Sequence, residues 1–138
     1  MYPESVSHFE IVKKLGEGGM GVVYQARDTD LGRMVALKFL PAEIASSPEK
    51  IVRFRQEARA ISTLNHPHIA TIYGMEDTDD SSFLILEYLP GGNLKQKLTE
   101  MKERGEQPSL RQVIDWMIQI SEGLAHAHLQ GGIFHGTD

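Results

Sequence analysis

Three glycines near the start of the chain have a spacing that suits phosphate binding. Gly16, Gly18 and Gly21 form the pattern G-x-G-x-x-G. Glycine has no Cβ, so a loop rich in glycine lets a ligand approach the backbone and can turn its N–H groups toward phosphate oxygens. Alone the pattern is a weak signal, because ordinary glycine-rich turns also match it. The flanking segments therefore decide which kind of site it indicates.

The segments on both sides of the glycines are predicted strands. Residues 9–15 read FEIVKKL and residues 22–26 read VVYQA, which are rich in β-branched and aromatic residues. A dinucleotide-binding fingerprint needs a helix directly after the third glycine, and a Walker-type loop needs Gly-Lys-Ser/Thr. Both are missing, so the sequence predicts a glycine-rich hairpin that lies over a nucleotide.

A lysine and a glutamate are the charged candidates for that site. In the predicted strand 34–40, Lys38 shares a face with Ala36, because side chains alternate along a strand. A helix is predicted over Ser47–Asn65, since a serine N-cap is followed by a proline. Glu57 lies at the rim of its apolar face, where an unpaired carboxylate is costly to desolvate. Lys38 is its expected partner, and a solvated rim glutamate is the alternative.

The rest of the chain is predicted to hold two more strands, a break and two helices, at residues 69–75, 83–89, 90–92, 93–104 and from Ser109 onward. Ser109 opens the last helix as a capping box with Gln112. His66 and His68 flank a proline and are interpreted as a turn at a helix end, so no metal site is predicted. Strands followed by helices indicate an α+β fold.

Composition narrows the class of protein. The chain has 138 residues and a net charge of −5, which argues against a nucleic-acid-binding surface. It has no cysteine, so disulfides and thiolate metal sites are excluded. No apolar run is long enough for a membrane span, and the first residues lack the pattern of a signal peptide. The expectation is a cytoplasmic globular protein without a nucleic-acid partner.

Taken together, these features resemble the protein kinase family, and within it the bacterial serine/threonine kinases. The motifs that carry the resemblance are the glycine-rich loop Gly16–Val23, the strand motif Val35–Lys38, the helix glutamate Glu57, the hinge-like Glu87–Gly92, and His135 at the start of a catalytic loop. The resemblance runs from about Phe9 to His135. Several motifs in family order are far more specific than the glycine pattern alone.

The resemblance implies a kinase-like N-terminal lobe, a five-stranded antiparallel sheet plus one helix, with a truncated helical remnant of the C-terminal lobe. Its expected divisions are a loose lead-in at 1–8, the N-lobe at 9–89 and the partial C-lobe at 90–138. ATP is the implied cofactor. The implied nucleotide-binding residues are Leu15, Gly16, Glu17, Gly18, Gly19, Met20, Gly21, Val22, Val23, Ala36, Lys38, Leu86, Glu87 and Leu89.

Within this implied site each residue has a role. Lys38 contacts the α- and β-phosphates and is held by Glu57, which makes these two the catalytic candidates. Val23 and Ala36 sandwich the adenine. The hinge at Glu87 and Leu89 binds the edge of the adenine, with Leu86 as gatekeeper. The implied reaction is transfer of the ATP γ-phosphate to a protein serine or threonine.

The chain departs from the family after His135. Glycine replaces the expected arginine, Thr137 stands at the catalytic aspartate, and Asp138 comes one residue late. The Asp-Phe-Gly motif that supplies the family's Mg²⁺ ligand is absent. We therefore expect this chain alone to bind ATP weakly without phosphorylating a protein. The alternative function is a non-catalytic, pseudokinase-like module. The apolar face of the helix after Ser109 is expected to be exposed, which favours self-association.

Overall fold

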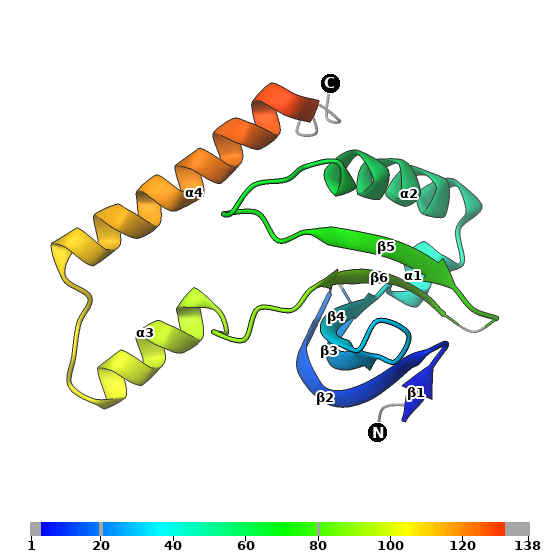
Figure 1. Cartoon of the computed structure of the whole chain (residues 1–138), viewed down its shortest axis with the longest axis horizontal. Helices are drawn as coiled ribbons and strands as arrows, with labels where there is room; N and C mark the ends of the chain where they lie inside the picture. Colours follow the sequence, from blue (N-terminus) through cyan, green and yellow to red (C-terminus); the bar gives the residue numbers. More distant parts are fainter. Residues whose placement is uncertain (1–3, 20, 80, 132–138) are drawn as a thin grey trace.

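The computed structural model describes residues 4–19, 21–79 and 81–131. A six-stranded antiparallel sheet has the order β1-β2-β3-β4-β6-β5. Four helices accompany it in the described part of the chain (Figure 1). The elements are β1 Ser5–Val6, β2 Phe9–Gly18, β3 Gly21–Asp28, β4 Arg33–Phe39, α1 Ala42–Ala45, α2 Pro48–Ser62, β5 Ile72–Asp77, β6 Ser82–Glu87, α3 Leu94–Glu103 and α4 Leu110–Gly131.

The sheet is curled around an apolar core on one of its faces (Figure 1). The core cluster consists of Phe9, Ala26, Val35, Leu37, Phe83 and Ile85. Phe9 and Phe83 meet edge to face, with ring centroids 6.0 Å apart. Burying an aromatic or aliphatic side chain of this size stabilises the fold by about 1.5–3 kcal/mol. Ser7, which follows one edge strand, donates a hydrogen bond of 3.0 Å to Glu76 on the other edge strand.

Two elements of the sheet region were not predicted. Ser5–Val6 pairs with the start of β2, so the sheet has six strands and the predicted loose lead-in at 1–8 is wrong for this part. A two-residue strand has no periodicity of its own and forms because β2 offers a free edge. The short helix α1 follows Pro41, whose carbonyl accepts hydrogen bonds from Ile44 and Ala45.

The helix α2 begins as predicted and packs on β5 (Figure 1). The Ser47 hydroxyl caps it by accepting a hydrogen bond of 3.4 Å from the Lys50 amide. Ala58 is its buried residue. The helix ends at Ser62, three residues before the predicted Asn65, with Thr63 as its C-cap.

After β6 the chain forms α3 and α4, which extend away from the sheet (Figure 1). Capping boxes open both: the predicted pair Ser109 and Gln112 at α4, and Asn93 with Gln96 at α3. In α4, Gly123 lies against the loop before β5, since a Cβ there would come within 2.9 Å of the His68 carbonyl oxygen. This glycine therefore allows the helix to approach the loop closely.

The apolar face of α4 is exposed, as the sequence predicts. The large apolar residues that remain exposed along this helix are Leu110, Ile114, Met117, Ile118, Ile120, Leu124 and Leu129. Ala127 and Gly123, on the side toward α2, are buried.

Candidate nucleotide site

The sheet brings four of the predicted nucleotide-binding residues to one face. Val23 lies opposite Lys38 in the pairing of β3 with β4, and Ala36 lies opposite Leu86 in the pairing of β4 with β6. Directly opposed residues of an antiparallel pair project to the same side. Val35 and Leu37 belong to the core cluster on the other face, so the predicted alternation of this strand is confirmed. Ala36 is buried, and the other three are half-buried.

The glycine-rich hairpin closes the β2–β3 end of this face. Gly18 pairs with Gly21, which has φ of +108°. A Cβ on Gly21 would lie 2.0 Å from the carbonyl oxygen of Phe39, so the backbone itself requires glycine here. Gly16 and Gly18 have no positive φ, and an added Cβ would meet nothing within 4 Å. Their lack of a side chain is therefore not explained by the fold.

Other predicted loop residues are exposed on the hairpin. Leu15 and Glu17 are exposed, and Glu17 forms an ion pair with Lys14 on the same strand. Val22 is half-buried. Met20 lies outside the described residues, as do His135, Thr137 and Asp138, so the predicted catalytic-loop positions have no structural counterpart here.

The predicted ion pair between Lys38 and Glu57 is absent from the part of the chain that the structure describes. Glu57 instead pairs with Arg53, one turn earlier on α2, with 3.3 Å between Arg53 Nε and Glu57 Oε1. The Glu57 side chain is 52% exposed, so this is a surface pair of small energetic value. The local partner is four residues away on the same helix, whereas the distant one requires α2 to bring Glu57 toward β4. The structure thus has Glu57 turned to its helical neighbour.

The hinge-like segment is tied to the start of β5. The Glu87 amide donates a hydrogen bond of 2.8 Å to the Thr71 carbonyl, and the Thr71 amide donates one of 3.0 Å to the Glu87 carboxylate. The Glu87 side chain thereby fixes the backbone at the end of β6. Leu89 is 54% exposed, two residues beyond this anchor.

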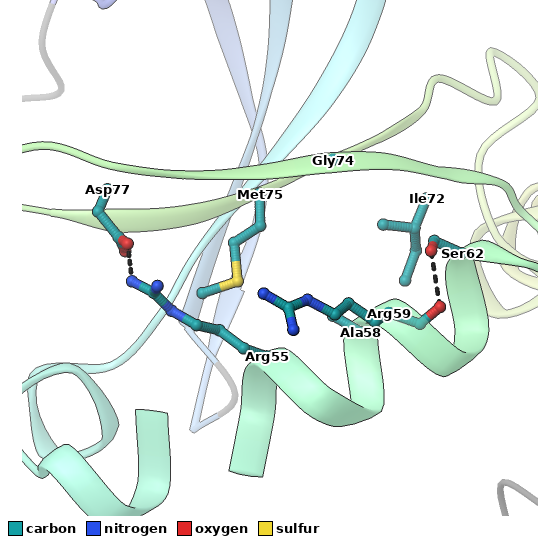
Figure 2. Close-up of a pocket in the computed structure, with 8 residues that line it drawn as sticks. All are labelled: Arg55, Ala58, Arg59, Ser62, Ile72, Gly74, Met75 and Asp77. Atoms are coloured by element: carbon teal, nitrogen blue, oxygen red, sulfur yellow. Dashed lines mark hydrogen bonds and ion pairs between the residues drawn. The ribbon is translucent and has the colours of Figure 1, made fainter. Parts of the chain in front are cut away.

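A second group of polar residues, at a cavity between α2 and β5, was missed in the sequence. Figure 2 shows Arg55 and Arg59 reaching from α2 toward Met75 and Asp77 of β5. Arg55 and Asp77 form an ion pair. The cavity is separate from the predicted nucleotide face. The spacing of the two arginines, i and i+4 on a helix, was the available signal.

Three ligand-type side chains also meet at the turn between β3 and β4. His8, Asp28 and Asp30 bring their ligand atoms within 4.8 Å of one another. Asp28 is buried, and its Oδ1 accepts hydrogen bonds from the amides of Asp30 and Leu31 at 2.9 and 3.1 Å. His8 Nε2 lies 3.4 Å from the same oxygen. These contacts fasten the turn to the start of β2, which accounts for the cluster without a metal.

A curled antiparallel sheet with a helix on its edge strand and a glycine-rich hairpin beside a buried alanine and a lysine is the architecture of a protein kinase N-terminal lobe. The family model for the protein kinase domain matches residues 9–136. The chain therefore belongs to the protein kinase family.

Bacterial serine/threonine kinases are among its relatives. The chain is 38% identical over 127 residues to the serine/threonine-protein kinase PrkC of Bacillus subtilis, covering 92% of this chain and 19% of PrkC. It is 38% identical over 128 residues to the serine/threonine-protein kinase PknA of Mycobacterium tuberculosis, covering 89% of this chain and 29% of PknA. The chain thus spans less than a third of these relatives.

Solved structures agree on the fold. The crystal structure of the Mycobacterium tuberculosis PknI kinase domain matches with a TM-score of 0.75 at 25% identity, covering 95% of this chain and 53% of that domain. A double mutant of the same domain matches with a TM-score of 0.77 at 24% identity. The chain spans about half of this kinase domain. Among the described helices, none combines the length and apolarity needed to cross a membrane.

Proposed function

We propose that this chain forms the ATP-binding half of a serine/threonine protein kinase domain. The observation that carries the proposal is the shared sheet face of Val23, Ala36, Lys38 and Leu86 beside the glycine-rich hairpin. The apolar members of this set suit the adenine ring, and the lysine suits the phosphates. In this proposal residues 9–89 are the nucleotide-binding lobe after a lead-in at 1–8, and residues 90–138 belong to the second lobe.

The hairpin supports the phosphate part of the proposal. Gly16 and Gly18 have open space where a side chain would stand, so a ligand can approach their backbone. Backbone N–H groups there can donate to phosphate oxygens while Lys38 supplies positive charge. Glu87 and Leu89 offer the backbone groups for the adenine edge, and the tie between Glu87 and Thr71 holds that backbone in place.

Glu57 has to exchange its partner for this site to take the arrangement expected of an active kinase. It must leave Arg53 and pair with Lys38, which orients the lysine toward the phosphates. The pair that breaks is exposed, so it opposes the exchange by less than about 1 kcal/mol. ATP supplies the γ-phosphoryl group, and the family uses Mg²⁺ to neutralise the developing charge. These 138 residues contain no Asp-Phe-Gly to hold that metal.

The test is a calorimetric ATP titration of the purified chain together with an assay of label transfer to a basic protein. We expect weak ATP binding and no transfer above background. Lys38→Met should weaken ATP binding about tenfold, as expected when a charged contact worth about 1.4 kcal/mol is lost. Lys95→Met is the matched control, because Lys95 is an exposed lysine on α3. Equal loss in both variants would contradict the proposed site, and transfer that disappears in Lys38→Met would contradict the expected inactivity.

A non-catalytic nucleotide- or partner-binding module is the second candidate function. The Arg53–Glu57 pair favours it, because Glu57 is engaged away from Lys38. The gene sequence downstream of codon 138 distinguishes the two candidates. An in-frame Asp-Phe-Gly motif supports the kinase, and a stop codon supports the module.

The proposal also covers partners, because the apolar face of α4 remains exposed. Met117 is 61% exposed and Ile114 is 46% exposed on this face. A second copy of the chain can cover such a face, so sedimentation of the purified chain should show self-association. Met117→Glu should shift the chain toward the monomer, whereas Arg111→Glu, on another side of the helix, should not. An unchanged monomer in all three proteins would contradict self-association.

A further inference from the structure

The cavity between α2 and β5 has a volume of about 220 Å³ and an unusual surplus of hydrogen-bond donors. Two guanidinium groups, those of Arg55 and Arg59, reach it from α2 (Figure 2). A single carboxylate, that of Asp77, faces them from β5. The cavity is also lined by the apolar side chains of Ala58, Ile72 and Met75.

The one carboxylate does not satisfy these donors. Asp77 forms an ion pair with Arg55 and also accepts a hydrogen bond of 2.7 Å from the Ser82 hydroxyl. The Nε of Arg55 is buried and has no hydrogen-bond partner. Among the described residues, the Arg59 guanidinium forms neither an ion pair nor a hydrogen bond. A buried donor without an acceptor is costly, so these groups point to an acceptor that comes from outside the chain.

The charge of the cavity indicates what that acceptor is. Two positive groups face one negative group, which leaves one positive charge in a chain whose net charge is −5. A single carboxylate balances this charge and can take parallel hydrogen bonds from an arginine fork. A doubly charged phosphate would overbalance it and lie beside Asp77, which repels it.

The place of the cavity in the fold indicates a peptide. In the described structure β5 is an edge strand that pairs only with β6, so its other side has unpaired backbone groups. An extended segment can run along such an edge. We infer that the α2–β5 cavity binds the carboxylate of a glutamate or aspartate side chain in an extended acidic segment of a partner protein, through Arg55 and Arg59.

The test uses the complete 138-residue chain and a fluorescein-labelled decapeptide with one central glutamate between leucine and alanine residues. Its matched partner has glutamine in place of the glutamate. At low salt, fluorescence anisotropy should show the glutamate peptide binding at least tenfold more tightly. The ¹⁵N spectrum should show the Nε–H signals of the two arginines shifting only with the glutamate peptide. Equal binding of both peptides, or no shift at millimolar peptide, overturns the inference.

Variants separate recognition from stability. Arg59→Gln should weaken binding of the glutamate peptide about tenfold, and Arg59→Lys should recover part of the loss because it restores the charge without the fork. Asp77→Asn should strengthen binding severalfold, because it removes the competing carboxylate. Lys50→Gln is the matched control: Lys50 is an exposed cation on α2 outside the cavity, so binding should not change. Circular dichroism melts verify that each variant is folded.

Two further arms test the identity of the ligand. A phosphoserine peptide that binds more tightly than the glutamate peptide overturns the assignment of a carboxylate. Inorganic phosphate or acetate that displaces the peptide at equal concentration overturns recognition of a peptide and leaves an adventitious anion only. Lys38→Met should bind the peptide like the unmodified chain, so this inference stands or falls apart from the proposed nucleotide site.

Discussion

The glycines of the hairpin should separate into one that the fold requires and others that a ligand requires. Gly21→Ala and Gly16→Ala test this with the same one-methyl change. At Gly21 the new Cβ would stand 2.0 Å from the Phe39 carbonyl oxygen, in a backbone with φ of +108°. At Gly16 it would meet nothing within 4 Å, and φ is not positive. The two variants therefore have opposite expected effects on stability and on ATP binding.

The magnitudes follow from these environments. A left-handed conformation that an L-residue rarely adopts costs about 1–3 kcal/mol. Relief of the clash must also move Phe39, which opposes Val22 in the β3–β4 ladder, and a weakened ladder hydrogen bond adds about 1 kcal/mol. Gly21→Ala should thus lower the free energy of unfolding by about 2–4 kcal/mol, or Tm by roughly 10 °C for a chain of this size. Gly16→Ala should change it by less than about 0.5 kcal/mol.

Thermal melts with and without ATP measure both effects. Gly16→Ala should melt like the unmodified chain but lose most of the Tm increase that ATP produces, because its methyl group occupies the space through which phosphate reaches the backbone. Gly21→Ala should melt early even without ATP. A large stability loss in Gly16→Ala would refute the open space seen at this position. An unchanged ATP response in that variant would refute a phosphate-binding role for the loop.

Three further predictions concern α2 and α4. Arg53→Gln should change the free energy of unfolding by less than about 0.5 kcal/mol, while it raises ATP affinity about two- to threefold by freeing Glu57 for the proposed pairing; a fall in affinity would contradict this. Ser109→Ala should cost about 1 kcal/mol in urea unfolding through loss of the α4 cap, and a neutral result would mean that the capping box does not hold this helix. Gly123→Ala should cost about 1–3 kcal/mol because its Cβ would meet the His68 carbonyl, and an unchanged melt would place α4 farther from the loop.

The sequence predicted the elements whose signals are local. The alternation in strand β4 placed Lys38 and Ala36 on one face, and the serine N-cap located the start of α2. The strand Ser5–Val6 was missed because its only support is pairing with a neighbour. The helix α1 was missed because four residues after a proline contain no apolar period.

The partner of Glu57 lay beyond local signals for a different reason. A helical wheel gives the direction of a side chain around its own axis, and this correctly put Glu57 at the rim of α2. The wheel does not give the distance from α2 to β4, which depends on how the helix packs on the sheet. Arg53, at i−4, is a neighbour of Glu57 for any position of the helix, so it takes the carboxylate whenever α2 stands away from Lys38.

The same geometry explains why one helix serves two separate sites. Glu57 and Arg59 are two residues apart, so they point about 200° apart around the helix axis. One side of α2 thus carries the glutamate that the nucleotide site needs, and the other side carries the arginines of the cavity at β5. Arg55 and Arg59 are four residues apart and share that second side. Apolar contacts at Ala58 hold α2 against β5, so the cavity is built from the same packing that sets where Glu57 lies.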